Sequence, residues 1–154
     1  KYTYTDVCWL LNWKAEEVSL NIGGYKYDKY TNTYPVFINY DKSEEVSASI
    51  RYEDRFVDQS RLIAISKSQR TIISDDVDNA IHAEERQILM PLFVRKNKDD
   101  KTSKEFYFLG TIKHNGHLQE FIMPDTDKSA VEIGYHLNTP VENNLYEYIT
   151  ERTI

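Results

Sequence analysis

The segment that mixes aromatic rings and charges most tightly is SASIRYEDRF, residues 47–56. If it forms a strand, alternate side chains point to opposite faces. One face then carries only charged groups, from Arg51, Glu53 and Arg55, and the other carries Ile50, Tyr52, Asp54 and Phe56. Asp54 is the exception, because it shares its face with apolar and aromatic neighbours. A carboxylate at the edge of an aromatic pocket can accept hydrogen bonds from the amino group of a planar ligand.

Asp54 also has two interpretations that need no ligand. If the strand ends near Glu53, Asp54 caps the turn that follows. Alternatively, Asp54 forms an ion pair with a nearby arginine. These structural roles are commoner for an aspartate than ligand binding, so the sequence leaves all three open.

Two segments carry basic residues in a pattern typical of contacts to phosphate. RKNKDDKTSK, residues 95–104, holds five cations against two acids, and RLIAISKSQR, residues 61–70, adds Arg61, Lys67 and Arg70. Loops of this kind position a protein on a nucleic-acid backbone without reading its bases. The alternative is an ordinary solvated loop.

The common catalytic motifs are absent from the sequence. There is no phosphate-binding glycine loop, no dinucleotide-binding fingerprint and no nucleophile elbow. His114 and His117 flank Asn115-Gly116, a strong turn signal that predicts a solvated hairpin tip. A metal site there would need a third ligand that the sequence does not provide. We therefore expect no catalytic residues, no metal and no cofactor.

Composition indicates one soluble globular domain. The chain has 154 residues, 40% hydrophobic and 29% charged, and no apolar run long enough to cross a membrane. Cys8 is the only cysteine, which excludes an internal disulfide and fits a cytoplasmic location. The net charge of −6 argues against a general nucleic-acid binder, although a local basic patch would still allow binding. The chain begins at Lys1 rather than Met, which fits a piece cut from a longer protein.

Strands dominate the predicted elements. Apolar alternation predicts strands in PVFINYD (35–41), SASIRYED (47–54), LIAIS (62–66), ILMPLFVRK (88–96), EFYFLGTIKH (105–114) and AVEIGYHL (130–137). Helical spacing predicts short helices near 3–13, with Thr5 as N-cap, near 74–81, with Ser74 as N-cap, and near 142–154. Residues 21–34 are predicted to form a loop or an irregular hairpin.

This order of elements predicts an α+β, mostly β fold. Because strands seldom alternate with long helices, the pattern argues against a doubly wound parallel sheet. We expect a strongly curved, mostly antiparallel sheet or a partly open barrel, with short helices at its ends, and a single domain over residues 1–154.

Motifs along the whole chain resemble a known family. They are, in order, GYKY, YPVFINYDK, YEDRF, ISKSQRTIISDDV, LFVRK, EFYFLG and IGYHLNTPVENNL. Together they resemble the domain of unknown function at the C-terminus of bacterial DEAD/DEAH-type helicases that also carry a phospholipase-D-like nuclease domain. More closely, the chain is similar to the target-recognition domain of ATP-dependent Type IV restriction endonucleases from staphylococci.

The resemblance implies a function and a fold. Such a domain reads 5-methylcytosine or 5-hydroxymethylcytosine in double-stranded DNA, while the nuclease and the helicase lie in other domains of the parent chain. Its fold would be like that of the SRA (SET and RING associated) domain of the PUA superfamily, a curved β-barrel that flips the modified base out of the duplex. The domain itself would not be an enzyme.

This sequence departs from the family pattern at three places. Ala64 and Ile65 stand where the family usually has a tryptophan, and Lys67 stands where an arginine is common. The family's YHK corresponds to residues 40–42, which are Tyr, Asp and Lys here. If that tryptophan stacks on the base in relatives, another ring must do so in this chain.

For a flipped cytosine, the residue pattern suggests a pocket and a phosphate contact surface. Asp54 would accept from the N4 amino group, and Tyr40 and Tyr52 would stack on the ring. The expected base pocket comprises Tyr40, Tyr52, Asp54, Phe56 and Ser66, and the expected phosphate contacts are Lys67, Arg70, Arg95, Lys96 and Lys98. The main alternative is a protein-interaction domain whose tyrosines dock on the helicase or nuclease part.

Overall fold

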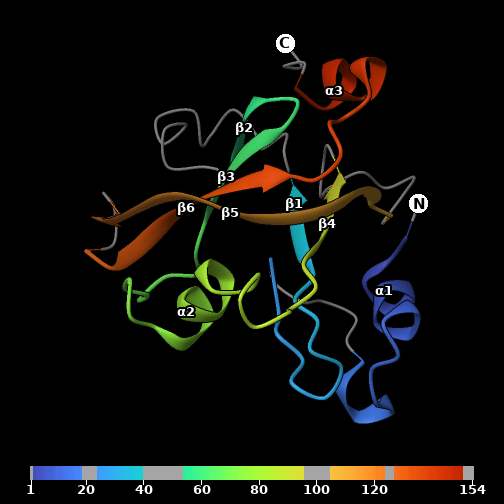
Figure 1. The fold of residues 1–154 in the computed structure, drawn as a ribbon, viewed down its shortest axis with the longest axis horizontal. Coiled ribbons are helices and arrows are strands. Elements are labelled where there is room, and N and C mark those ends of the chain that lie inside the picture. The colour runs from blue at the N-terminus through green and yellow to red at the C-terminus, as the bar shows by residue number, and fades with distance from the viewer. Residues whose placement is uncertain (1, 19–23, 40–53, 96–104, 124–126, 151–154) are drawn as a thin grey trace.

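The computed structural model describes residues 2–18, 24–39, 54–95, 105–123 and 127–150. Within these ranges the helices are α1 (Tyr4–Leu10), the short 3-10 helix η1 (Ala15–Glu17), α2 (Asp75–Ile81) and α3 (Asn143–Thr150). The strands are β1 (Val36–Asn39), β2 (Arg55–Asp58), β3 (Arg61–Ile65), β4 (Pro91–Arg95), β5 (Tyr107–Ile122) and β6 (Ser129–Leu137). Apart from the strand expected at SASIRYED, the expected strands and helices have counterparts among these elements (Figure 1). Residues 47–53 of SASIRYED lie outside the described residues, and β2 begins only after Asp54, at Arg55.

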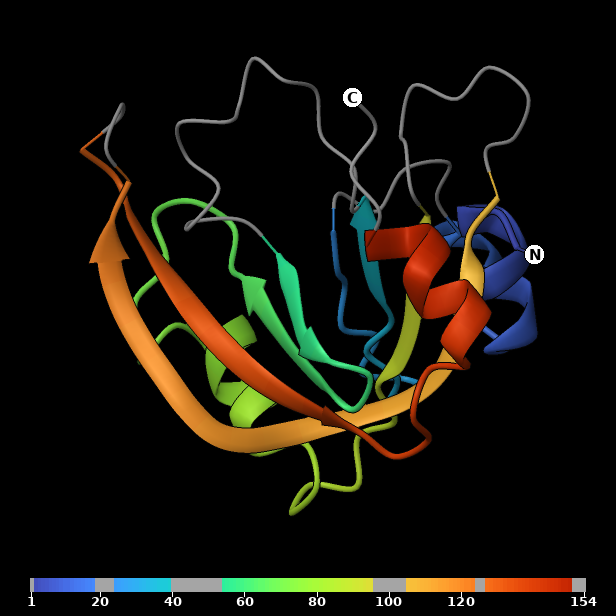
Figure 2. The same ribbon diagram turned by 90° about the horizontal axis from the view of Figure 1, so that it is seen from above.

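All six strands form one curved sheet in the order β1-β4-β5-β6-β3-β2. Every pairing is antiparallel except that of β1 with β4, which is parallel. The long β5 arches beneath the other strands, so that both halves of the sheet open toward the same side (Figure 2). This is the mostly antiparallel, partly open architecture that the sequence predicts.

The arch of β5 contains an irregularity at Asn115-Gly116. His114 pairs with Tyr135 and Leu118 with Ile133, so three residues of β5 lie opposite Gly134 alone. The prediction of a hairpin tip at Asn115-Gly116 is therefore wrong. A two-residue hairpin of this kind needs positive φ at both central residues, but only Gly116 has it, at 99°. Because β6 pairs with β5 on both sides of the dipeptide, the extra residues form a bulge that bends the strand.

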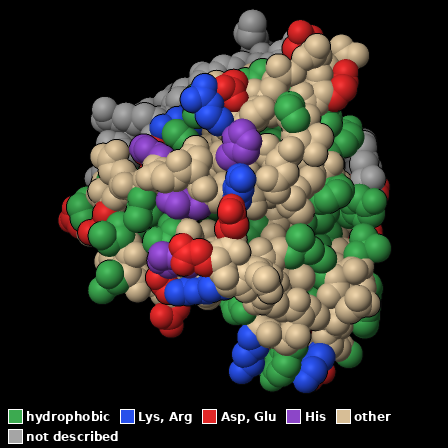
Figure 3. Space-filling model, viewed as in Figure 1, with side chains coloured by type: hydrophobic (Ala, Val, Ile, Leu, Met, Phe, Trp, Pro, Cys, Tyr) green, Lys and Arg blue, Asp and Glu red, His purple; other side chains and the backbone are tan. Residues whose placement is uncertain are grey.

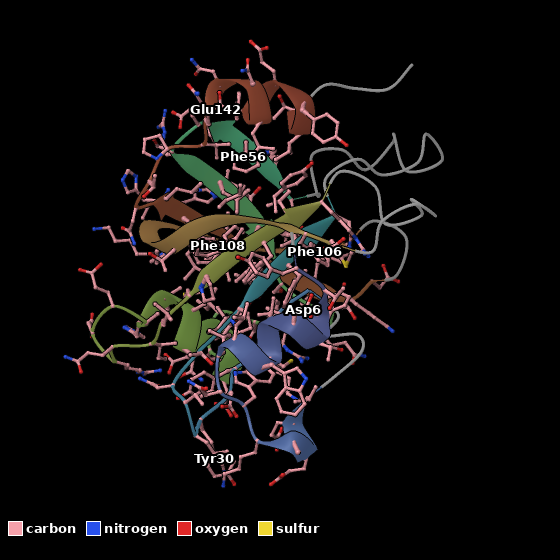
Figure 4. All side chains as sticks on the ribbon, turned by 90° about the vertical axis from the view of Figure 1, so that its right-hand side faces the viewer. Asp6, Tyr30, Phe56, Phe106, Phe108 and Glu142 are labelled. Atoms are coloured by element: carbon pink, nitrogen blue, oxygen red, sulfur yellow. The ribbon has the colours of Figure 1, made fainter. Side chains whose placement is uncertain are left out.

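The hydrophobic core fills the inside of the curved sheet. Alternate residues of the strands point inward there, among them Ile38, Leu62, Leu92, Val131 and Tyr135. Three phenylalanines on the other side of β1, β4 and the start of β5 pack beneath α1, namely Phe37, Phe93 and Phe106. Figure 4 shows Phe106 beside α1 on this second layer. This half of the sheet is therefore covered on both faces.

Two helix caps differ from the expectation. The N-cap of α1 is Thr3 rather than Thr5, because the Thr3 hydroxyl and the Asp6 carboxylate form a reciprocal capping box. Ser74 does precede α2, but its hydroxyl accepts from the backbone N–H of Thr71 and makes no capping bond to the helix. No helix among the described residues is long and apolar enough to cross a membrane.

Residues 24–34 form an irregular hairpin beside β1. Tyr25 pairs with Val36, and Asp28 pairs with Thr33. The other side of this hairpin meets the chain just after β3, where Lys67 donates from its backbone N–H to the Tyr25 hydroxyl at 3.0 Å. The hairpin therefore bridges the gap between the two halves of the curved sheet.

Candidate functional site

Strand ends from both halves of the sheet gather at its open side, which we call the rim. It comprises the ends of β1, β3 and β4 and the starts of β2 and β6, at Asn39, Ile65, Arg95, Arg55 and Ser129. Figure 2 shows these ends directed toward the same side of the molecule. The described residues of the expected pocket and phosphate contacts all lie at or next to the rim, apart from Phe56; Arg70 is next to it because its backbone N–H donates to the carbonyl of Ser129.

Asp54 stands at the rim directly before β2, half-buried. Its Oδ1 accepts a hydrogen bond of 2.7 Å from the backbone N–H of Ile65, at the end of β3. Asp54 therefore precedes a described strand instead of capping the turn after one. The Asp54 carboxylate also affects a buried side chain, Tyr135. Burial is the main cause of the raised pKa of Tyr135, and the negative charge of Asp54 contributes to it.

Three tyrosines lie close together in the interior near the rim, and Tyr135 is the one whose pKa is affected by Asp54. The rings of Tyr25 and Tyr34 stack with their centroids 5.5 Å apart and 16° between their planes. Tyr34 and Tyr135 are almost fully buried, whereas Tyr25 is half-buried. Burial raises the pKa of Tyr34 and Tyr135 far above the usual range, with smaller contributions from Tyr25 and Asp76 nearby. The Tyr34 hydroxyl donates to the backbone carbonyl of Asp76 at 3.0 Å.

Asp76, in the first turn of α2, joins Tyr25 to the loop after β3. Its Oδ2 accepts from the Tyr25 hydroxyl at 2.5 Å and from Nε of Arg70 at 2.8 Å. Lys67 completes the group, because its Nζ donates to the backbone carbonyl of Tyr25 at 3.0 Å and lies 4.6 Å from the centre of that ring. We call Tyr25, Lys67, Arg70 and Asp76 the rim network.

The remaining expected site residues have structural contacts. Phe56 is buried in the core and packs edge-on against Tyr146 of α3 (Figure 4). The Ser66 hydroxyl accepts from the backbone N–H of Val131 at 2.8 Å and so extends the pairing of β3 with β6. Arg95 donates to Asn39 and lies over the ring of Phe106. The other four, Tyr40, Tyr52, Lys96 and Lys98, lie outside the described residues.

Tyr25, Tyr34 and Asp76 are site residues that sequence reasoning does not single out. Tyr25 and Asp76 are 51 positions apart, so no local pattern connects them. Their only signals are the GYKY motif and the run of acids after Ser74. The sequence places the first in a loop and the second in the first turn of a helix. Both placements are correct, but neither points to a shared site.

His114, His117 and His136 lie on β5 and β6, and His82 directly follows α2. Figure 3 shows the histidines on one face of the molecule. His117 is 2.9 Å from Glu132, which also pairs with Arg55 at 2.7 Å, so one carboxylate connects β5, β6 and β2. Within the described ranges no three histidine, cysteine or acidic side chains are arranged to hold a metal ion. His117, Glu132 and Arg55 therefore link three strands on the outer face of the sheet.

The rim network predicts an acid-sensitive contribution to stability. Burial alone would raise the pKa of Asp76, but the bonds from Tyr25 and Arg70 outweigh it and hold the pKa below the ordinary 3.8. A carboxyl with a lowered pKa stabilises the fold above its unfolded-state pKa, and that contribution is lost as the pH falls through the folded-state pKa. We expect Asp76→Asn to reduce the fall in Tm between about pH 5 and pH 3, measured by circular dichroism.

Asp75→Asn is the matched control, since Asp75 is an exposed acid of the same helical turn. It should leave the acid-induced fall in Tm as it is in the unchanged chain. If both substitutions flatten the profile equally, the effect comes from general charge and not from the bonds of Asp76.

A curved, mostly antiparallel sheet with short helices at its ends defines an SRA-like fold. The chain superposes on the structure described as SUVH5 SRA–hemi methylated CG DNA complex with a TM-score of 0.55 and 11% identity, covering 92% of this chain and 89% of that one. The SUVH5 SRA bound to fully hydroxymethylated CG DNA gives 0.51 and 10%, with 92% and 89% covered. SUVH6 of Arabidopsis thaliana in complex with SAM gives 0.52 and 10%, with 92% of this chain and 26% of that one.

At these identities the likeness concerns the fold. By sequence, residues 1–149 match the family described as Domain of unknown function (DUF3427), and the chain belongs to this family. No curated protein matches the sequence.

Proposed function

We propose that this chain binds double-stranded DNA and recognises 5-methylcytosine or 5-hydroxymethylcytosine. The observation that carries the proposal is the composition of the rim and the interior next to it. The Asp54 carboxylate is bonded to the N–H of Ile65, two residues before Lys67, and Lys67 lies over the ring of Tyr25, which stacks on Tyr34. Arg70 is held at Asp76, which also binds the Tyr25 hydroxyl. The SRA-like fold supports it, because structures of that fold have been solved with methylated and hydroxymethylated DNA.

A cytosine flipped out of the duplex presents its N4 amino group as a donor and N3 and O2 as acceptors. In this proposal Asp54 accepts from N4. The 5-methyl group enters an apolar hollow. Burying one methyl contributes only about 0.8 kcal/mol, or roughly a fourfold preference, so a stronger preference requires that the unmodified base seats poorly.

Stacking on the base needs an aromatic ring, and Tyr25 joins the candidates Tyr40 and Tyr52. One face of Tyr25 is covered by Tyr34, and the Lys67 ammonium lies over the ring. A lysine side chain on the surface moves easily, so a base could take its place while the ammonium turns to a phosphate. Stacking of this kind contributes about 1–3 kcal/mol per base. Phe56 and Ser66 support this pocket from the core and from the β3–β6 pairing.

The proposal is tested by measuring the affinity of the chain for two kinds of duplex that differ in one base. Fluorescence anisotropy with a labelled duplex containing one 5-methylcytosine or 5-hydroxymethylcytosine should give tighter binding than with the unmodified duplex, by at least about fourfold. Equal affinities for all three duplexes would refute modified-base recognition, and a lack of binding would favour a protein-docking domain.

The phosphate-binding cations make a separate prediction. Removing one cation that binds a phosphate should lower the slope of log K against log salt by about 0.9, so Lys67→Gln with Arg70→Gln should lower it by nearly 2. Affinity for modified and unmodified DNA should fall alike, because phosphate contacts carry no sequence information. Arg95, Lys96 and Lys98 belong to the same proposed surface.

Two cations far from the rim serve as controls for this substitution. Lys113 pairs with Glu84 on the outer side of β5, and Arg61 pairs with Asp58 at the opposite end of β3. Lys113→Gln with Arg61→Gln makes the same charge change and should leave the slope unaltered. A slope that falls equally in both double variants would show a general charge effect.

We further propose that this domain recognises the target for an ATP-dependent Type IV restriction endonuclease in the cytoplasm. The nuclease and helicase would belong to other domains of the parent chain, and this domain would not catalyse a reaction. One observation favours a docking function as the second candidate, because Trp9 and Leu10 of α1 are 55% and 61% exposed.

A further inference from the structure

One carboxylate oxygen of Asp76, in the rim network, accepts hydrogen bonds from two side chains with different proposed functions. Oδ2 accepts from the hydroxyl of Tyr25, a candidate stacking ring, and from Arg70, a candidate phosphate contact. Oδ1 accepts from the backbone N–H of Val77 at 3.0 Å, which fixes the orientation of the carboxylate on α2. The carboxylate is thus held by its own helix and holds two side chains from other segments.

The geometry leaves Arg70 able to bind a phosphate. Asp76 engages Nε, and the carbonyl of Ser68 lies 3.4 Å from Nη1. The Tyr25 side chain also contacts the guanidinium. Because a guanidinium has five N–H donors, at least two remain for an outside acceptor. The Arg70 side chain is 36% exposed and that of Asp76 is 22% exposed, so the acid lies deeper than the cation it holds.

The same carboxylate fixes the ring of Tyr25. The Tyr25 hydroxyl donates to Asp76 and accepts from the backbone N–H of Lys67 at 3.0 Å. Any displacement of the loop that carries Lys67 and Arg70 therefore alters bonds that hold this ring in place. Likewise, a displacement of the ring alters the position of Arg70.

We propose that Asp76 is a positioning residue that couples recognition of the modified base at Tyr25 to phosphate binding by Lys67 and Arg70. The proposal rests on the proposed function of the rim. It predicts that the seating of a modified base strengthens the phosphate contacts, so that the two contributions to affinity are not independent. A carboxylate that merely began the helix would leave them independent.

The experiment measures this dependence with a double-mutant cycle. Tyr25→Phe and Arg70→Gln are combined in the unchanged chain and in the Asp76→Ala chain, and affinities for the 5-methylcytosine duplex and the unmodified duplex are compared over a salt series. With Asp76 present, the two substitutions should be non-additive by about five- to tenfold on the modified duplex. With Asp76→Ala, the affinities should combine additively, and the preference for the modified base should fall to within about twofold of none.

Two further variants separate positioning from folding. Asp76→Asn keeps an oxygen for Tyr25 and Arg70 but loses the charge, and it should restore part of the preference. Asp75→Ala removes a neighbouring acid of the same turn and should change neither the preference nor the additivity. All affinities are corrected for the folded fraction at the assay temperature.

Three results would overturn the proposal. The first is an Asp76→Ala chain that binds both duplexes more tightly by the same factor, because Asp76 would then only repel phosphate. The second is a lower Tm with unchanged preference and non-additivity, which would show a purely structural role. The third is additivity in the unchanged chain, which would exclude coupling. Failure of the proposed function is distinct, since the unchanged chain would then show no preference for the modified duplex.

Discussion

Replacing Asp54 by asparagine is expected to abolish the preference for modified cytosine while leaving the fold intact. The asparagine oxygen can still accept from the backbone N–H of Ile65, so the junction between β2 and β3 is kept. The asparagine NH2 group then takes the place of the second carboxylate oxygen. It is a donor and faces the N4 amino group of the base, which is also a donor, so the hydrogen bond is lost. Because hydrogen bonds to charged groups contribute about 1.5–3 kcal/mol, we expect a ten- to hundredfold weaker affinity for the modified duplex.

Binding to the unmodified duplex should change by less than about twofold, since phosphate contacts dominate it. Asp58→Asn is the matched control, because Asp58 ends the same strand and lies at the opposite side of the sheet from the rim. Asp54→Ala should in addition lower Tm, because it leaves the Ile65 N–H without this acceptor. Equal losses on both duplexes with Asp54→Asn would remove Asp54 from the base pocket.

Replacing Gly134 by alanine is expected to lower stability by about 1–3 kcal/mol, which is roughly 3–10 °C in Tm for a domain of this size. Gly134 is the residue that faces the bulge in β5. A Cβ built there would clash with Oδ1 of Asn115 and would lie 2.7 Å from Cβ of His117. The Asn115 oxygen cannot simply turn away, because it accepts from the backbone N–H of His117 at 3.0 Å.

Thermal melts followed by circular dichroism measure this effect, and two variants localise it. Asn115→Ala in the Gly134→Ala chain removes the clash with Oδ1 and should recover part of the lowered Tm. Gly116→Ala tests backbone strain alone, because nothing lies within 4 Å of its Cβ position while its φ is 99°. Its cost should be about 1–2 kcal/mol and should not be relieved by Asn115→Ala. An unchanged Tm for Gly134→Ala would show that the bulge is not tightly packed.

Local patterns predict most of the elements because alternation and helical spacing report which side chains face the core. Val36 and Ile38 point inward on β1, and Val131, Ile133 and Tyr135 do so on β6, as their spacing indicates. The two predicted strands on either side of RKNKDDKTSK correspond to β4 and β5, which pair with each other antiparallel. The bulge escapes prediction because Asn115-Gly116 has the same local signal in a hairpin and in a bulge, and the partner strand decides between them.

Only part of the candidate site could be predicted from the sequence. Asp54 stands out by its place among apolar neighbours, but its partner is a backbone group on another strand, which no side-chain pattern reveals. The departure at Ala64 and Ile65 implies that another ring must serve this chain. Tyr25 is a candidate for that ring, and it reaches the rim only because the hairpin of residues 24–34 bridges the curved sheet.

The sequence by itself determined a mostly β domain, the inward faces of its strands and the family to which it belongs, because each of these depends on residue types at short spacing. Tertiary structure decided that β5 bends at a bulge instead of turning back, and that Tyr25, Arg70 and Asp76 meet in one network. The physical reason is that these features depend on hydrogen bonds between segments as many as 51 residues apart. Such bonds depend on how the curved sheet brings distant segments together, so no periodic pattern in the chain reports them.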